Sequence, residues 1–198
     1  MSTVSMEEIK KLRDMSGAGL ADSREALEES NGDLDKAFDF LRKKGASKAQ
    51  SRAHKEAKEG FIGSYIHNGR IGVMVEVNCE TDFVARNEKF QEFARNLAMH
   101  IAAANPLYLT SDEVPAEVIK KEEEIYKEEL LKEGKPENII ENILKGKMAK
   151  YYEQVCLMNQ KYVKDDSKTI EELLQELVAS IGEKTVIKRF VRFEIGLD

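Results

Sequence analysis

Two strand-like runs joined by a tight-turn signal constrain the fold of this chain most strongly. Phe61 to Ile66 and Ile71 to Val77 are connected through Asn68-Gly69, the pair favoured in type I′ hairpin turns because both turn positions need positive φ. The second run places apolar residues on one face with the period of two of a half-buried strand: Ile71, Val73, Val75 and Val77. The sequence therefore predicts an antiparallel hairpin with one face toward a core.

A third strand and two amphipathic helices complete a predicted α+β core at 60–198. Thr185 to Ile195 is expected to return to the hairpin as its third strand. Its apolar residues are predicted to share one face: Ile187, Val191, Phe193 and Ile195. Helical periodicity from Asn87 to about Asn105, and again from Thr169 to Gly182, predicts helices that pack on a small antiparallel three-stranded sheet. The first helix carries a continuous apolar stripe: Phe90, Phe93, Ala94, Leu97, Ala98 and Ile101.

An antiparallel helical arm is expected as an insertion in this core at about 115–155. In its first half, Glu123 and Glu128 each precede a lysine by four residues, the favourable spacing for ion pairs on a helix. Gly134 and Pro136 then reverse the chain. Both helices carry thin apolar stripes, which is typical of a contact arm rather than of a core.

The amino-terminal residues 1–45 are predicted to form a separate module of three short helices. Ser5 and Glu8 have the spacing of a capping box, and Gly17 is expected to end the first helix. Gly45 is expected to lie beyond the end of the third helix. Fewer than fifty residues with three apolar stripes predict one small helical core.

Residues 46–59 are predicted to be a basic linker. The stretch 42–58 carries seven Lys or Arg against one Glu and no large apolar residue. A solvated hinge or frayed helix is the plain interpretation, and an arm that binds a polyanion is the alternative. The alternative would make the protein a nucleic-acid-binding adaptor with steeply salt-dependent RNA binding, although the stretch contains no aromatic residue for base stacking.

Charge and hydropathy exclude several classes of protein. A net charge of −6 over 198 residues argues against nucleic acid as the principal partner, because phosphate binding needs a concentrated basic surface. No apolar run approaches the roughly 20 residues that cross a bilayer. No membrane association is therefore expected, and a cytoplasmic location is the default.

The residues that usually carry catalysis or bind metals are scattered. No phosphate-cradling GxxxxGK[ST] loop occurs, so no nucleotide binding is expected. His54, His67 and His100 lack the spacing of a metal pair. Cys79 and Cys156 lie far apart without a CxxC motif, which indicates two reduced thiols. The sequence thus predicts a binding protein with no cofactor and no metal, rather than an enzyme.

A thiol enzyme based on Cys79 is the remaining catalytic hypothesis. Glu80 and Asp82 lie beside this cysteine. Nearby carboxylates raise the pKa of a thiol, which is the opposite of what a reactive thiolate needs.

The junction after the second strand, NCETDFV at Asn78–Val84, sets a bulky Phe83 beside the carboxylate of Asp82. An aromatic ring is normally buried, whereas an aspartate in a turn stays in water. The pair therefore either straddles the boundary of the core or presents the ring outward.

Two stretches carry a recognisable pattern. LRDMSGAGLADSREAL (Leu12 to Leu27) and EVNCETDFVAR (Glu76 to Arg86) resemble the signatures of elongation factor Ts, and the likeness continues in the same order through AMHIAAANP at Ala98 to Pro106. Arg24 stands where the first signature usually has Lys, and Glu80 stands where Gln is common. Both replacements keep size or polarity.

The resemblance implies a protein of translation elongation, the guanine-nucleotide exchange factor of elongation factor Tu, with a UBA-like three-helix module. In that family, the module and the body grip the GTPase domain of elongation factor Tu. The module contacts would involve residues near Leu12, Arg13, Gly17, Gly19 and Leu20. The motif that disturbs the partner's magnesium and nucleotide site would be Thr81, Asp82, Phe83 and Val84.

Within this motif, the resemblance makes Phe83 the wedge and Asp82 its polar partner, whereas a core position for Phe83 remains the competing interpretation. Longer family members carry the core module twice, but this chain has strands, helix and arm enough for one. A single core offers fewer contacts to the partner, and family members of that kind pair into dimers. Homodimerisation through the sheet is therefore our hypothesis.

Overall fold

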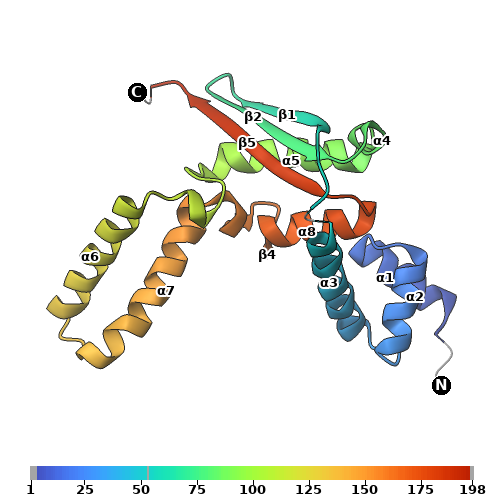
Figure 1. Ribbon diagram of the computed structural model, residues 1–198, viewed down its shortest axis with the longest axis horizontal. Coiled ribbons are helices and arrows are strands. Elements are labelled where there is room, and N and C mark those ends of the chain that lie inside the picture. Colours follow the sequence, from blue (N-terminus) through green and yellow to red (C-terminus); the bar gives the residue numbers. More distant parts are fainter. Residues whose placement is uncertain (1–3, 53, 197–198) are drawn as a thin grey trace. The chain divides into compact units, whose positions relative to one another are not determined.

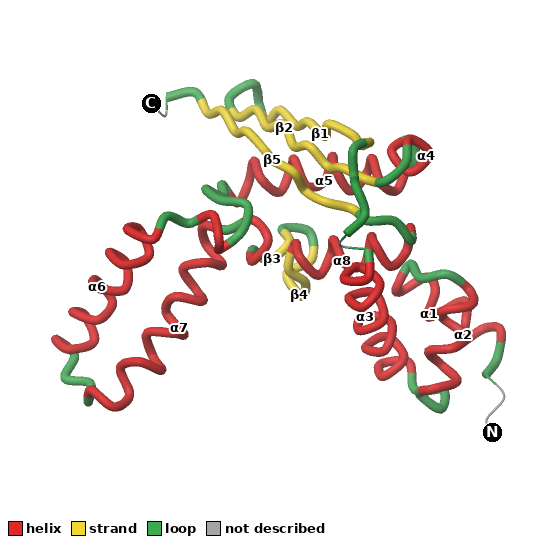
Figure 2. Tube along the Cα trace, viewed as in Figure 1, coloured by secondary structure: helices red, strands yellow, loops and turns green. Residues whose placement is uncertain are grey.

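The computed structural model describes residues 4–52 and 54–196 and has the predicted α+β architecture (Figure 1). Strands β1 (Glu59–His67), β2 (Ile71–Cys79) and β5 (Thr185–Glu194) form one sheet in the order β1-β2-β5. The helices are α1 (Met6–Ser16), α2 (Leu20–Glu29), α3 (Leu34–Ser51), α4 (Asp82–Ala85), α5 (Glu88–Ala104), α6 (Ala116–Lys132), α7 (Glu137–Val155) and α8 (Ile170–Ile181). Short 3-10 turns at Ser111–Glu113 and Leu157–Asn159, and a ribbon of β3 (Lys161–Tyr162) with β4 (Asp165–Thr169), complete the described elements (Figure 2).

The chain divides into two compact units. One takes its residues from 1–65, 74–98 and 171–191, and the other from 66–73, 99–170 and 192–198. The first unit therefore holds α1–α4, α8 and most of the sheet, whereas the second holds the paired helices α6 and α7 with the β3–β4 ribbon.

The β1–β2 hairpin forms as predicted. Asn68 and Gly69 both adopt positive φ, at 50° and 69°, which is the backbone of a type I′ turn. The N–H of Arg70 donates to the carbonyl of His67 at 2.9 Å and closes the turn. The predicted inward stripe of β2 is buried at Val73, Val75 and Val77, and every residue of the predicted stripe of α5 is also buried.

The third strand differs from its predicted pattern. Ile187 is buried as expected, but the other residues of the predicted face, Val191, Phe193 and Ile195, are exposed. Lys188 and Arg189 are two consecutive exposed residues, and they shift the alternation by one. Residue Arg192 then takes an inward place, where its guanidinium donates to the carbonyl of Ala102 in α5. Strict period-two alternation fails wherever a strand contains such an irregularity.

Helix α3 continues to Ser51, beyond its predicted end before Gly45. Gly45 is buried against α8, where an added Cβ would lie 2.9 Å from the Cβ of Ala179. An ion pair between Arg42 and Glu172 joins the same two helices. Glycine costs a helix interior about 1 kcal/mol, but close packing of two helices offsets that cost, so α3 passes through the glycine instead of ending there.

The three helices α1–α3, called the head below, enclose the small core that the sequence predicts. The side chain of Ser5 accepts from the N–H of Glu8, and Gly17 ends α1 with a φ of 67°. The fully or nearly fully buried residues of this core are Ile9, Leu12, Ala18, Ala26, Leu27, Ala37 and Leu41.

In the second unit, α6 and α7 lie side by side as the predicted antiparallel pair (Figure 1). Lys147 of α7 donates to Glu129 of α6 at 2.9 Å, and its ammonium lies 5.0 Å from the ring centroid of Tyr126. Leu130 and Ile140 are among the few buried residues of the pair. The narrow apolar contact that the thin stripes predict between the two helices is therefore present.

His100 is a fully buried histidine of the second unit. The N–H of Val163 donates to its Nδ1 at 3.3 Å, so Nε2 carries the proton and donates to the side-chain oxygen of Gln160 at 3.0 Å. Burial lowers the pKa of His100 below its ordinary value, and the Val163 N–H also leaves no room for a proton on Nδ1.

We expect folding to weaken in acid because of this histidine. Below about pH 6.5 the unfolded chain binds a proton on His100 that the folded chain excludes, so the free energy of unfolding falls by up to about 1.4 kcal/mol per pH unit. Urea unfolding at pH 7.5 and 5.5 measures the loss. The variant His100→Asn keeps an acceptor for Val163 but does not titrate, and it should lose less stability over the same interval. Equal losses in the two proteins would contradict the expectation.

Candidate functional site

The predicted TDFV motif lies where β2 passes into α4. Thr81 has extended backbone angles and is the N-cap of α4, which begins at Asp82. Its Oγ1 accepts from the N–H of Val84 at 3.4 Å, a long capping bond. The four residues therefore form a single short turn of helix at the end of a strand.

The four motif residues have two different environments. Val84 is buried, whereas Asp82 is exposed and Phe83 is 79% exposed. The competing interpretation of Phe83 as a core residue at the strand end is therefore wrong. Asp82 pairs with Arg86 at 2.9 Å, but both side chains are in water, so this pair stabilises the turn little.

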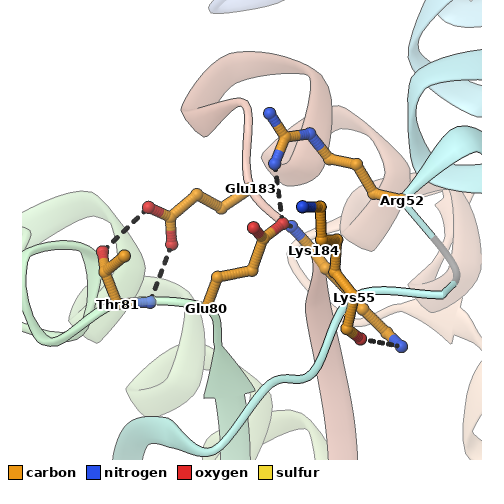
Figure 3. A network of polar contacts seen from close by, with 6 residues as sticks. All are labelled: Arg52, Lys55, Glu80, Thr81, Glu183 and Lys184. Atoms are coloured by element: carbon orange, nitrogen blue, oxygen red, sulfur yellow. Dashed lines mark hydrogen bonds and ion pairs between the residues drawn. The ribbon is translucent and has the colours of Figure 1, made fainter.

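Two carboxylates hold this junction from outside the motif (Figure 3). Glu183, in the turn between α8 and β5, accepts from the N–H of Thr81 at 3.1 Å and from its hydroxyl at 2.8 Å. Glu80 accepts in return from the N–H of Lys184 at 2.7 Å. We call these four residues, Glu80, Thr81, Glu183 and Lys184, the carboxylate clamp.

The clamp also reaches the residues that follow α3. Arg52 donates to Glu80 at 2.7 Å, and Lys184 Nζ donates to the carbonyl of Lys55 at 2.8 Å (Figure 3). The Lys184 N–H, followed by the Arg52 guanidinium, holds the pKa of Glu80 below its usual range. Glu80 is therefore ionised at neutral pH and strengthens the hydrogen bonds that it accepts.

Cys79 lies beneath the junction. It is fully buried, and its thiol donates to the carbonyl of Thr81 at 3.2 Å. Burial, followed by the nearby charge of Glu183, raises the pKa of Cys79 to about 11. The thiol is protonated at neutral pH, which argues against a nucleophilic thiol enzyme.

The predicted module contacts surround the turn between α1 and α2. Arg13, Gly19 and Leu20 are exposed, and Leu20 is one of the exposed large apolar residues of the head. Leu12 is fully buried in the core of the head, so it supports this surface from beneath. Gly17 supplies the left-handed backbone of the turn.

Lys89 of α5 joins the head turn to the body of the first unit, a contact that the sequence did not reveal. Its Nζ donates to the hydroxyl of Ser180 in α8 at 2.6 Å. A Cβ added to Gly17 would lie 2.6 Å from the same Nζ. Burial lowers the pKa of Lys89. Glycine at position 17 therefore leaves room for the Lys89 ammonium beside the head turn.

Much of the basic stretch at 42–58 is engaged within the chain, although residue 53 of the predicted linker lies outside the described residues. Lys44 pairs with Asp22 at 2.9 Å and with Glu25 at 2.5 Å. Arg42 pairs with Glu172, and Arg52 with Glu80. Cations that are neutralised by the chain's own carboxylates attract phosphate weakly, so these contacts disfavour the adaptor hypothesis.

The remaining site classes find no support in the described residues 4–52 and 54–196. Within them, no group of three or more His, Cys, Asp or Glu residues could hold a metal ion. None of the helices in the same ranges is long and apolar enough to cross a membrane. The exposed Asp82–Phe83 pair on its clamped turn is thus the most distinctive feature of the first unit.

Residues 46–197 match the protein family described as Elongation factor TS. The chain belongs to this family. Elongation factor Ts of Thermotoga petrophila is 54% identical over 194 residues, which cover 98% of this chain and 96% of the relative. Elongation factor Ts of Solidesulfovibrio magneticus is 54% identical over 199 residues and 100% of both chains. Elongation factor Ts of Geobacter sulfurreducens is 52% identical over 195 residues, with 98% of this chain and 90% of the relative covered.

These relatives confirm the resemblance read from the two signatures. Because they align with nearly the whole chain, the likeness to elongation factor Ts includes the head, most of which the family match at 46–197 leaves out. These two relatives are also of nearly the same length as this chain.

Proposed function

We propose that this chain is the guanine-nucleotide exchange factor of elongation factor Tu and promotes GDP release so that GTP can bind. Membership of the elongation factor Ts family supports the partner and the role in translation. The observation that carries the mechanism is the position of Phe83, whose ring is exposed on a turn that buried Val84 and the carboxylate clamp hold in place.

A ring held in this way loses little freedom when it enters a pocket of the partner, so more of its burial free energy remains for distorting the pocket. In the proposed mechanism, Phe83 enters elongation factor Tu beside the magnesium and nucleotide site, with Asp82 as its polar neighbour. Displacing the magnesium removes charge neutralisation from the nucleotide phosphates, and GDP then dissociates faster. Exposed Arg13 and Leu20 of the head provide a second contact with the partner.

Linkage explains how the factor would leave. If binding of the factor lowers the affinity of elongation factor Tu for nucleotide by some ratio, binding of nucleotide lowers its affinity for the factor by the same ratio. Entry of GTP therefore releases the factor for another cycle. The chain would act without covalent chemistry and without a cofactor of its own, in the cytoplasm where translation takes place.

Stopped-flow release of labelled GDP from purified elongation factor Tu tests the proposal. We expect substoichiometric amounts of the chain to accelerate release, the rate to saturate with factor concentration, and excess unlabelled GDP to dissociate the complex. A release rate that does not respond to the factor would refute the exchange function.

We further propose that two copies pair through the face of the sheet opposite α5. The side chains of Ile62, Met74 and Val191 line one depression beside the ion pair of Arg189 with Glu76. A row of exposed apolar side chains on a sheet is typical of an interface, and a twofold axis would match the face with itself.

A charge at the centre of this face should separate the copies. We expect the wild-type chain to sediment at twice its 22.5 kDa mass at micromolar concentration. Met74→Glu would bury two like charges near the axis and weaken the dimer at least about tenfold. Leu131→Glu on α6 is a matched control, because Leu131 is 48% exposed and Met74 is 51% exposed. A wild-type chain that sediments as a monomer would rule out the dimer.

A further inference from the structure

The carboxylate clamp joins two chain reversals that are far apart in the sequence. The side chain of Glu183 binds the backbone N–H of Thr81, and the side chain of Glu80 binds the backbone N–H of Lys184. Each reversal therefore supplies one carboxylate and receives one (Figure 3). All four residues belong to the first compact unit.

The turn that presents Phe83 needs such support. Helix α4 has four residues, and one isolated helical turn is unstable because it fixes several dihedral angles for a single hydrogen bond. Its own capping bond, from the Val84 N–H to Thr81 Oγ1, is long at 3.4 Å. The shorter bond at Thr81 Oγ1 is the one that it donates to Glu183, at 2.8 Å. The direction of the turn thus depends on a residue outside the motif.

We propose that Glu183 is a positioning residue for nucleotide exchange: it fixes the N-cap of α4 and so sets the direction in which Phe83 leaves the surface. The inference rests on the proposed exchange function. Glu183 bonds to Thr81 and acts on the partner through Phe83. A carboxyl group that accepts from both the backbone N–H and the hydroxyl of Thr81 holds this N-cap at two points, whereas the cap's own bond to Val84 holds it at one.

The second half of the clamp extends this role to the head. Glu80 accepts hydrogen bonds from the Lys184 N–H and from the Arg52 guanidinium. Its carboxylate therefore connects the residues before α4 to the residue that follows α3. Helix α3 in turn packs on α8 at Gly45 and Ala179, and α8 leads directly into the Glu183 turn. The head and the turn of α4 are therefore held by the same elements of the first unit.

A fluorescence experiment tests the positioning directly, without elongation factor Tu. The chain contains no tryptophan, so Phe83→Trp introduces a single reporter at the exposed position. Removing the carboxylate with Glu183→Ala should lower the steady-state anisotropy of this tryptophan by increasing the local motion of the turn. Glu183→Gln keeps one acceptor oxygen and should lie between. Glu92→Ala, which removes an exposed glutamate of α5, is the control and should change nothing.

The exchange assay gives a second, functional readout. We expect Glu183→Ala to lower the maximal rate of stimulated GDP release by on the order of tenfold, while the factor concentration at half-maximal rate changes less. In the Phe83→Ala background the same change should have almost no further effect, because Glu183 acts through the ring. Partial rescue by Glu183→Gln would separate positioning from a failure to fold.

The outcomes distinguish the inference from the function on which it rests. If wild-type chain accelerates GDP release and Glu183→Ala changes neither anisotropy nor rate, the positioning role is wrong. It is also wrong if the losses from Glu183→Ala and Phe83→Ala simply multiply. If wild-type chain fails to accelerate release, the proposed function fails, and the anisotropy of the tryptophan reporter still decides whether Glu183 orders the turn.

Discussion

Replacing Phe83 by alanine is expected to slow factor-stimulated GDP release by roughly ten- to a hundredfold without abolishing it. Burying one phenylalanine side chain contributes about 1.5–3 kcal/mol, which corresponds to between one and two decades in an equilibrium constant. The effect should approach this full value because Phe83 is 79% exposed in the free chain, so most of its surface can still be buried on binding. Contacts of the head with the partner would maintain the residual rate.

The same exposure predicts that Phe83→Ala leaves the fold intact. A core phenylalanine would lower the melting temperature strongly when truncated, but an exposed ring contributes little to the folded state. Melting curves should therefore superimpose for wild type and variant while the release rates differ. Stopped-flow measurement with labelled GDP at saturating factor gives the rate.

Leu107→Ala provides the matched control for this experiment. Leu107 is 62% exposed and lies in the second unit, away from the TDFV motif in the sequence. Its truncation should leave stimulated release unchanged. A Phe83→Ala protein that releases GDP at the wild-type rate, or a Leu107→Ala protein that is equally slow, would defeat the assignment of Phe83.

Local signals in the sequence predicted the elements that depend on local chemistry. The type I′ turn follows from Asn68 and Gly69, because few residues other than asparagine and glycine accept positive φ readily. The start of α1 follows from the capping box of Ser5 and Glu8. Each of these features is decided within a few residues, so one sequence is sufficient to find it.

The structure differs from the sequence-based predictions where distant parts of the chain meet. Gly45 is a helix-ending signal in isolation, but contact with Ala179 of α8 makes it a close-packing position inside α3. Glu183 belongs to no motif in the sequence, and its bond to Thr81 crosses 102 positions. Such pairings leave no local pattern in the sequence, so the motif was predictable and the residue that supports it was not.

Phe83 lies between these two cases. The sequence showed that a large ring stands beside Asp82 at the end of a strand, but it left both burial and exposure open. Exposure was decided by the neighbours: Val84 and Ala85 occupy the inward side of the short helix α4, so residue 83 must point away. A single turn has only one inward face, and its occupant follows from tertiary packing.

The second large effect is expected at Gly63 of β1. Gly63 is buried under α5, and a Cβ at this position would overlap the backbone carbonyl of Ala94. A backbone group of a long helix cannot rotate away as a flexible side chain can, so α5 would have to shift off the sheet. We expect Gly63→Ala to lower the free energy of unfolding by about 2–3 kcal/mol and the melting temperature by about 4–10 °C.

Gly72→Ala in β2 separates this packing effect from the general effect of replacing a strand glycine. No atom lies within 4 Å of a Cβ built at Gly72. Alanine there should be neutral or slightly stabilising, because it reduces the freedom of the unfolded chain. Equal destabilisation by the two substitutions would show that the approach of α5 to β1 is not the cause.

The Gly63→Ala substitution should also affect the proposed exchange site. Helix α5 begins at Glu88, three residues after α4 ends at Ala85, and its residue Lys89 contacts α8 beside the head turn. A shift of α5 would therefore move both the turn that presents Phe83 and the support of the head. We expect Gly63→Ala, assayed below its melting temperature, to slow GDP release, whereas Gly72→Ala should keep the wild-type rate. A destabilised but fully active Gly63→Ala protein would mean that α4 holds its place through the carboxylate clamp alone.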